Sequence, residues 1–318
     1  MNIEKVCILG GSGFVGHHLS ARLAAAGVRC RIVTRHPQRH RDQAVLPGAE
    51  VVAGNIGDTA ELRRLFEGCD GVINLVGILN ERGKGGAEFR NIHVDLVDRI
   101  TEAARGTGVR RFLHMSALNA SAGQGTSEYL RSKGEGENQA HTRGHSSMEV
   151  TSFRPSVIFG PGDSFFNRFA GLLKSAPGVF PLACPHSRFQ PVYVGDVAEA
   201  FVRALNDRTA WDRHYDLCGP EVYTLHELVE YTAGVIGKKV RVVGLGDFLS
   251  RVQGRVLQHA PGKPFSYDNY LSLQTDSVCD KNDLGTLGIT ARDIGSVVPL
   301  YLGRESQRGR LDGLRRLV

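Results

Sequence analysis

Three glycines near the N-terminus have the spacing of a loop that holds a phosphate. Gly10, Gly13 and Gly16 stand in the string ILGGSGFVGHHL, between an apolar β-branched run and an amphipathic helical pattern. At such a strand-to-helix turn, glycines let the backbone approach a pyrophosphate, and the helix N-terminus supplies free N–H groups and a favourable dipole. The sequence therefore predicts a dinucleotide site built from these glycines together with Phe14 and Val15.

The next expected strand is followed by an arginine rather than by an acidic residue. Folds that bind NAD usually carry Asp or Glu at this position, where it binds the ribose 2′-hydroxyl. Here the strand ends at Arg35, and residues 29–41 hold five arginines and no acid. A guanidinium pairs with a 2′-phosphate through charge-assisted hydrogen bonds. This chemistry favours NADP(H) as the cofactor, with NAD(H) as the alternative, while Arg39 and Arg41 are expected to be solvated.

A phenol and an ammonium group share one face of a later predicted helix. Tyr129 and Lys133 lie four residues apart in EYLRSKGEGE, which is the spacing of neighbours on a helix surface. Glu137, His141 and His145 continue the same spacing and could imitate a metal-binding face. An Arg-Gly break just before His145 predicts a frayed helix end there, so we predict no metal site.

Strand and helix patterns alternate through the first half of the chain. Apolar β-branched runs predict strands at residues 6–9, 31–34, 51–52, 72–76, 112–115 and 149–153. Helical periodicity predicts helices at residues 15–26, 59–67, 89–105 and 130–141. Such alternation is typical of right-handed βαβ crossovers and a parallel sheet. We predict an α/β, Rossmann-type doubly wound parallel sheet over residues 1–175, and a smaller cap subdomain over residues 176–318 that is partly interleaved with it.

The excess positive charge is concentrated in two segments. The 318 residues carry 39 Lys and Arg against 33 Asp and Glu, a net charge of +6. Residues 29–41 contribute +5, and residues 303–318 contribute five arginines minus two acids, or +3, so the rest of the chain is at −2. No nucleic-acid-binding signature accompanies this charge, which predicts no nucleic-acid partner. The terminal segment is expected to touch an anionic membrane surface or a partner protein, or to remain a solvated tail.

The cysteines and the apolar runs bear on the compartment. The six cysteines stand at positions 7, 30, 69, 184, 218 and 279 without a Cys-x-x-Cys pair, so we expect free thiols in a reducing compartment. No apolar run approaches the roughly 18 residues that span a bilayer. The N-terminal residues lack the pattern of a signal or transit peptide. We therefore expect a cytoplasmic protein, with peripheral membrane association as the alternative.

The glycine spacing and the Tyr–Lys pair together resemble the short-chain dehydrogenase/reductase superfamily. Within it, the strings VINLVGIL, RPSVIFGPGDSFFNRFA, FQPVYVGDVAEA and GPEVYTLHEL look like an atypical, extended branch related to the nucleotide-binding accessory subunit of respiratory complex I, the ninth alpha-subcomplex subunit. The resemblance implies that Tyr129 is the general acid/base, while Lys133 lowers the tyrosine pKa and holds the nicotinamide ribose. It places Ser116 as the third catalytic residue, although the usual position is held by Ala117 or Leu118.

The same resemblance implies further cofactor contacts and a function. The contacts are Asn55 and Ile56 at the adenine, Val76 and Gly77 at the ribose, and Pro155, Ser156 and Val157 at the nicotinamide. The function would be an NADPH-dependent oxidoreductase acting on a small carbonyl or alcohol, or on a quinone-type ligand. The alternatives are a non-catalytic, NADPH-bound scaffold or assembly subunit of a respiratory complex, a redox sensor and, more distantly, an NAD-dependent sugar-nucleotide epimerase or dehydratase.

Overall fold

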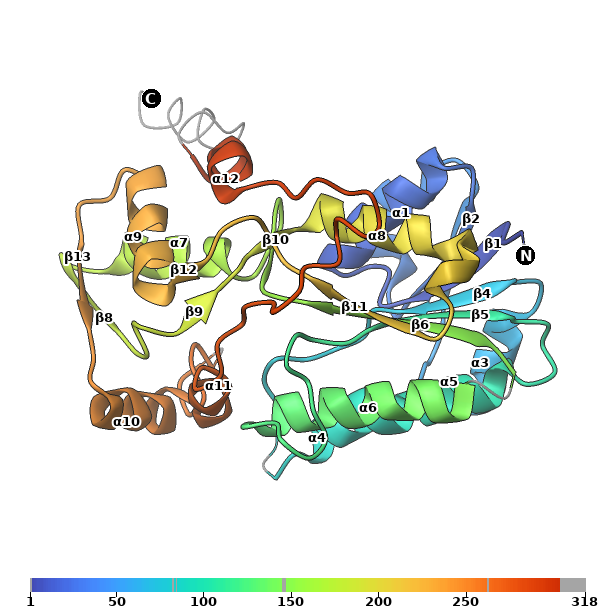
Figure 1. Cartoon of the computed structure of the whole chain (residues 1–318), viewed down its shortest axis with the longest axis horizontal. Helices are drawn as coiled ribbons and strands as arrows, with labels where there is room; N and C mark the ends of the chain where they lie inside the picture. The colour runs from blue at the N-terminus through green and yellow to red at the C-terminus, as the bar shows by residue number, and fades with distance from the viewer. Residues whose placement is uncertain (1, 82, 84, 145–146, 262, 304–318) are drawn as a thin grey trace. The chain divides into compact units, whose positions relative to one another are not determined.

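The chain forms two compact units, shown in Figure 1. The computed structural model describes residues 2–81, 83, 85–144, 147–261 and 263–303. Unit 1 comprises Met1–Pro155, Gly195–Leu217 and Asn282–Ile289, and unit 2 comprises Ser156–Val194, Cys218–Lys281 and Thr290–Val318. The sequence predicts a boundary at residue 175, whereas the chain first leaves unit 1 after Pro155 and then returns to it twice.

Unit 1 is built on a seven-stranded sheet in which all neighbouring strands run parallel. The strand order is β11-β6-β5-β4-β1-β2-β3. The strands are β1 (Lys5–Leu9), β2 (Arg29–Thr34), β3 (Ala49–Ala53), β4 (Gly71–Asn74), β5 (Arg111–Met115), β6 (Glu149–Pro155) and β11 (Arg213–Leu217). The order reverses between β1 and β4, and parallel sheets bind ligands beyond the carboxyl ends of the strands at such a point. The predicted Rossmann-type α/β fold is confirmed.

Helices cover both faces of this sheet, as Figure 1 shows. On one face, Phe201 stacks on Phe153 of β6 with ring centroids 4.0 Å apart. On the other face, Leu65 and Ile100 join one buried cluster with Phe112 of β5. The helical segments of unit 1 are α1 (Phe14–Ala25) and α8 (Val194–Asn206) on the first face, α3 (Thr59–Phe66), α4 (Ala87–Arg90), η2 (Asn91–Asp95), α5 (Leu96–Ala104) and α6 (Glu128–Gly144) on the second, and the short η1 (Pro37–Arg39), α2 (Arg41–Ala44) and η3 (Arg208–Ala210).

Unit 2 combines three two-stranded sheets with five helices in its described residues. Its strand pairs are β7 (Ile158–Phe159) with β10 (Val192–Tyr193), β9 (Arg188–Phe189) with β12 (Tyr223–Thr224), and β8 (Val179–Leu182) with β13 (Arg241–Gly244). Its helices are α7 (Phe166–Ser175), α9 (Leu225–Val235), α10 (Asp247–Leu257), α11 (Tyr267–Ser272) and α12 (Ile294–Leu302). Aromatic rings fill its core: the ring centroid of Phe165 lies 5.2 Å from the ring centroids of both Phe166 and Phe169.

The basic segment 304–318 lies outside the described residues. None of the described helices has the length and apolar character needed to cross a membrane.

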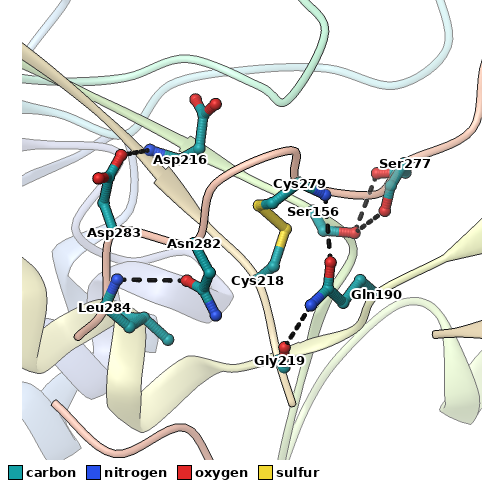
Figure 2. Close-up of a disulfide and its surroundings, with 10 residues drawn as sticks. All are labelled: Ser156, Gln190, Asp216, Cys218, Gly219, Ser277, Cys279, Asn282, Asp283 and Leu284. Atoms are coloured by element: carbon teal, nitrogen blue, oxygen red, sulfur yellow. Dashed lines mark hydrogen bonds between the residues drawn. A yellow bond between two sulfur atoms is a disulfide. The ribbon is translucent and has the colours of Figure 1, made fainter. Parts of the chain in front are cut away.

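Two cysteines of unit 2 form a disulfide, so the expectation of six free thiols is wrong for Cys218 and Cys279. Figure 2 shows that Gln190 joins the same two segments. Its Nε2 donates to the Gly219 carbonyl at 2.8 Å, and its Oε1 accepts the N–H of Cys279 at 3.1 Å. The segment that follows β11 and the segment around Ser277 are therefore held together by one covalent link and by a shared glutamine.

Removing this disulfide should lower the free energy of unfolding. The two cysteines are separated by 61 residues, and closing a loop of that size restricts the unfolded chain by about 4 kcal/mol in the chain-entropy model. We expect the double variant Cys218→Ser/Cys279→Ser to lose about 2–4 kcal/mol in non-reducing urea denaturation. A thiol reductant should destabilise the natural protein by a similar amount and leave the double variant unchanged. A titration of the unfolded, oxidised protein that finds six thiols instead of four would contradict the assignment.

Candidate cofactor and active site

The turn between β1 and α1 has the geometry of a phosphate cradle. Gly10 follows β1 with a φ of 77°, a left-handed conformation that favours glycine. A Cβ atom there would lie 3.1 Å from the backbone of Leu75 and Val76. A Cβ atom at Gly16 would lie 2.4 Å from the backbone of Gly11, so α1 packs directly on the turn. The turn therefore presents bare backbone, which the close approach of a pyrophosphate requires.

The N-terminus of α1 is open to an anion. Gly13 caps the helix without a side-chain hydrogen bond, and the first turn contains no acidic residue. The N–H groups of Phe14 and Val15 lack a carbonyl partner within the helix, because they belong to its first turn. These N–H groups and the helix dipole favour a negatively charged group. The residues present fit the pyrophosphate of a dinucleotide.

Arg35 differs from Arg29 and Arg31, the two arginines of its segment that lie within the strand. It lies directly beyond β2, at the edge of the sheet where β1 also ends, because the two strands pair in parallel register. Arg29 pairs with Glu4 at 3.6 Å, and Arg31 pairs with Glu50 at 3.2 Å. Within the described ranges, Arg35 is exposed and forms no ion pair. Its guanidinium is available to a ligand at the carboxyl edge of the sheet.

Lys133 is enclosed at the carboxyl ends of β4 and β5. Its Nζ donates to the carbonyl of Met115, the last residue of β5, at 2.5 Å. A Cβ atom at Gly77 would lie 3.8 Å from the same Nζ, so Gly77 borders the ammonium group and leaves space beside it. Burial lowers the pKa of Lys133 to about 8, against the opposing charge of Glu137. The predicted ribose residues Gly77 and Lys133 are thus neighbours.

His93 belongs to this site, although no sequence motif predicts a role for it. It lies in η2, a π-helical turn between α4 and α5, and such turns are frequent at functional sites. Its Nε2 accepts the N–H of Ile78 at 3.1 Å, which places its proton on Nδ1, and Nδ1 lies 2.8 Å from the Ser132 hydroxyl. Burial, and then the charge of Lys133, lower the pKa of His93 to about 2, so the imidazole stays neutral. His93 therefore connects the segment after β4 to α6. It lies within an amphipathic helical pattern, in which a single histidine does not indicate a functional role.

Tyr129 lies one helical turn before Lys133 on α6, as the spacing predicts. Its half-buried ring meets the His93 ring edge-on at 5.7 Å and the Phe89 ring at 6.2 Å. The structure therefore brings Tyr129, Lys133 and Gly77 around one imidazole.

The Ser116 hydroxyl has a partner inside the protein. It donates to Oε2 of Glu137 at 2.8 Å, and Ser116 is only 3% exposed. Glu137 also accepts from Arg154 Nε at 2.8 Å and lies 2.6 Å from His214 Nδ1. Burial opposes the ionisation of Glu137, but the hydrogen bonds and charges of His214 and Arg154 hold its pKa at about 2. The Ser116 proton is thus engaged by a carboxylate, and its catalytic role stays a prediction.

The same network contains three residues of types that can bind a metal ion. Donor atoms of Glu137, His141 and His214 lie within 4.8 Å of one another, whereas His145 lies outside the described residues. The imidazole rings of His141 and His214 stack with centroids 4.1 Å apart. Because Arg154 already bonds to both oxygens of Glu137, we interpret the group as an ion-paired network.

The predicted adenine residues follow β3. The exposed Asn55 folds its Oδ1 back to accept the N–H of Gly57 at 3.0 Å, which leaves its amide N–H₂ group to face solvent or a ligand. Ile56 packs partly against the buried cluster of unit 1, as does Val76 beyond β4. The Asn55 amide and the Ile56 side chain thus lie at the carboxyl edge of the sheet.

The predicted nicotinamide residues are divided between the units. Pro155 is the last residue of β6 in unit 1, whereas Ser156 and Val157 begin the first segment of unit 2. The Ser156 hydroxyl donates to the carbonyl of Ser277 at 2.7 Å, as Figure 2 shows. Ser156 therefore has a structural partner within unit 2.

The parallel sheet, its glycine turn and the enclosed lysine together define a dinucleotide-binding α/β protein. Residues 6–218 match the model of the NAD dependent epimerase/dehydratase family. The chain belongs to this family.

Curated relatives refine the resemblance. The chain is 29% identical over 281 residues to the NADH dehydrogenase (ubiquinone) 1 alpha subcomplex subunit 9 of Mus musculus mitochondria, covering 81% of this chain and 71% of that protein. It is 32% identical over 245 residues to the ceramide reductase of Caulobacter vibrioides, covering 76% and 74%. The solved structure of gox2253 superposes with a TM-score of 0.74 at 19% identity, over 94% of this chain and 96% of that one. The predicted superfamily branch and fold are confirmed.

Nucleotide binding should weaken as the pH rises through the pKa of Lys133. The ammonium form donates hydrogen bonds and carries a positive charge, and both are lost when the group deprotonates above about pH 8. We expect the Kd for a nicotinamide dinucleotide to be constant between pH 6.5 and 7.5, and to rise by about an order of magnitude towards pH 9.5. Fluorescence titration measures it, and Lys133→Met should bind weakly with a flat pH profile. A flat profile for the natural protein, or the same slope in Lys133→Met, would contradict this role.

Proposed function

We propose that this protein binds NADP(H) at the carboxyl edge of the unit 1 sheet and moves hydride to or from a small carbonyl or alcohol. The observation that carries the proposal is the enclosed ammonium of Lys133 beside Gly77, with Tyr129 one helical turn earlier. A cation is costly to bury, and a lysine enclosed at this edge suits a hydroxylated, negatively charged ligand.

The residues divide the chemistry between them. When bound, the cofactor supplies or accepts the hydride. Lys133 holds the ribose, and its positive charge favours the phenolate that Tyr129 forms when it gives up its proton. The Tyr129 hydroxyl donates a proton to the substrate oxygen during reduction and recovers it during oxidation. Neutral His93 keeps the segment after β4 and helix α6 in place without adding a second positive charge beside Lys133.

The preference for NADP(H) rests on Arg35. Arg29 and Arg31 are neutralised by glutamates, while the exposed Arg35 keeps its charge for a ligand. A 2′-phosphate would satisfy this guanidinium through bidentate hydrogen bonds, whereas a 2′-hydroxyl could not.

A second candidate is a non-catalytic, cofactor-bound subunit of a respiratory complex. The engagement of Ser116 by Glu137 favours it, because the donor that would polarise a substrate carbonyl is then missing from that position. The mouse relative carries the name of a complex I subunit, whereas the Caulobacter relative is named as a reductase. We rank the oxidoreductase first because Tyr129 precedes the enclosed Lys133 by one helical turn, which supports a role for the pair as acid/base and ribose contact.

Replacing Arg35 should change the choice of cofactor. We expect Arg35→Asp to weaken NADPH binding by at least about tenfold, from the loss of a charge-assisted pair, and to leave NADH binding within about twofold. Calorimetric titration with both nucleotides measures the ratio. Arg39→Asp, four positions further along the same segment, is the matched control and should behave like the natural protein. A natural protein that binds NADH more tightly than NADPH would overturn the cofactor assignment.

Removing the phenolic hydroxyl should abolish turnover while keeping the cofactor. We expect Tyr129→Phe to lower kcat by about 10²–10⁴-fold, the usual contribution of a general acid, with the NADPH Kd within about twofold. Oxidation of NADPH is followed with a panel of ketones, quinones and nucleotide sugars, and Tyr267→Phe in α11 serves as the control. Unchanged turnover in Tyr129→Phe would refute the catalytic role. Tight NADPH binding with no turnover on the whole panel would favour the subunit function.

A further inference from the structure

Helix α10 of unit 2 turns its large apolar side chains outward. Phe248 is 73% exposed, Val256 61%, Leu249 53% and Val252 39%. With 3.6 residues per turn, these four positions lie within an arc of about 100° on one side of the helix. A helix of an ordinary soluble unit places such a stripe against the core.

The side of α10 that packs against unit 2 carries small residues instead. Ser250 is 1% exposed, and its hydroxyl accepts the N–H of Cys184 at 3.1 Å. Gly254 is buried where a Cβ atom would lie 3.2 Å from the carbonyl of Ser266, so the backbone before α11 packs directly on it. The apolar stripe is therefore not needed to attach α10, because the opposite side already does so.

The stretch of sequence that contains the stripe carries an excess of positive charge. Residues 238–263 contain six Lys and Arg against one acid, a net charge of +5. That acid, Asp247, is engaged by the Tyr270 hydroxyl at 2.5 Å and by Arg251 at 3.3 Å. Arg251 and Arg255 are exposed beside the stripe, and the guanidinium of Arg255 lies 5.0 Å from the centroid of the Tyr267 ring. The arginines are thus held next to the apolar side chains.

We infer that this surface, formed by Phe248, Leu249, Val252 and Val256 with Arg251 and Arg255, binds the protein to an anionic phospholipid bilayer. An exposed Phe, Leu and Val stripe flanked by arginines is the composition of helices that lie in a membrane interface. The apolar chains enter the acyl boundary, and the arginines remain at the level of the lipid phosphates. The terminal residues 304–318 are a poor occupant of this face, since they carry a net charge of the same sign, +3. The inference is independent of the cofactor and of the catalytic roles.

Vesicle sedimentation of the full chain tests the inference. We expect binding to mixed phosphatidylglycerol/phosphatidylcholine vesicles at least about tenfold tighter than to phosphatidylcholine alone, and weaker in high salt. The double variant Phe248→Ser/Val256→Ser should bind the mixed vesicles at least about tenfold more weakly. The control Leu300→Ser/Val222→Ser removes two other exposed apolar side chains, of which Leu300 is as exposed as Phe248 at 73%, and should bind as the natural protein does.

A pair of arginine variants tests the electrostatic part. Arg255→Gln should weaken binding to the mixed vesicles about threefold or more. Arg208→Gln should leave it unchanged, although Arg208 is also an exposed arginine over an aromatic ring, with its guanidinium 5.7 Å from the centroid of Trp211. An unaltered circular dichroism spectrum shows that each variant is folded.

Three results would overturn the inference. The first is absence of binding to the mixed vesicles by the natural protein. The second is an equal loss of binding in both double variants, since the surface on α10 would then have no special part. The third is a concentration-dependent dimer that Phe248→Ser/Val256→Ser converts to a monomer, because the occupant of the surface would then be a second copy of this chain.

Discussion

The burial of one ammonium group governs the arrangement of unit 1. Lys133 is 4% exposed, and a buried cation needs compensating partners. The Met115 carbonyl accepts from it, and Glu137 supplies negative charge one turn further along α6. Nearby imidazoles must then remain neutral: burial and the charge of Lys133 lower the pKa of His93 to about 2 and that of His114 to about 3.

The partners of that lysine connect the site to the rest of the sheet. Glu137 is held ionised by Arg154 from β6 and by His214 from β11, so the last two strands at one edge of the sheet support the charge near its centre. His93 links the segment after β4 to α6 through Ile78 and Ser132. The charge balance of one side chain therefore requires elements that are far apart in the sequence.

Local sequence patterns predict most of unit 1. The features that they do not predict depend on contacts between residues that are far apart in the sequence. The glycine turn, Arg35 and the Tyr129–Lys133 spacing can be read from a few consecutive residues, because hydrophobic periodicity and turn chemistry are local. Strand β11 is not predicted by such patterns, since its sequence RHYDL is largely polar and the strand with which it pairs, β6, lies some 60 residues earlier. The Cys218–Cys279 disulfide and the Glu137–His214 contact likewise join residues 61 and 77 positions apart.

In helix α10 the sequence pattern indicates the wrong buried side. Its periodicity alone would place Phe248, Val252 and Val256 in a core. Only the structure shows that Ser250 and Gly254 occupy the packed side, because close backbone approach at Gly254 decides the orientation of the helix. Most residues of the proposed nucleotide site thus belong to unit 1, while unit 2 carries the disulfide and an outward apolar surface.

The central claim is that a nicotinamide dinucleotide binds at the carboxyl edge of the unit 1 sheet. Hydrogen–deuterium exchange of the protein with and without NADPH tests it most directly, because it locates the ligand without requiring a substrate. The account predicts slower exchange on NADPH addition in the glycine turn, residues 10–16, and in residues 74–78 after β4. Unchanged exchange in both segments, or protection confined to unit 2, would contradict it.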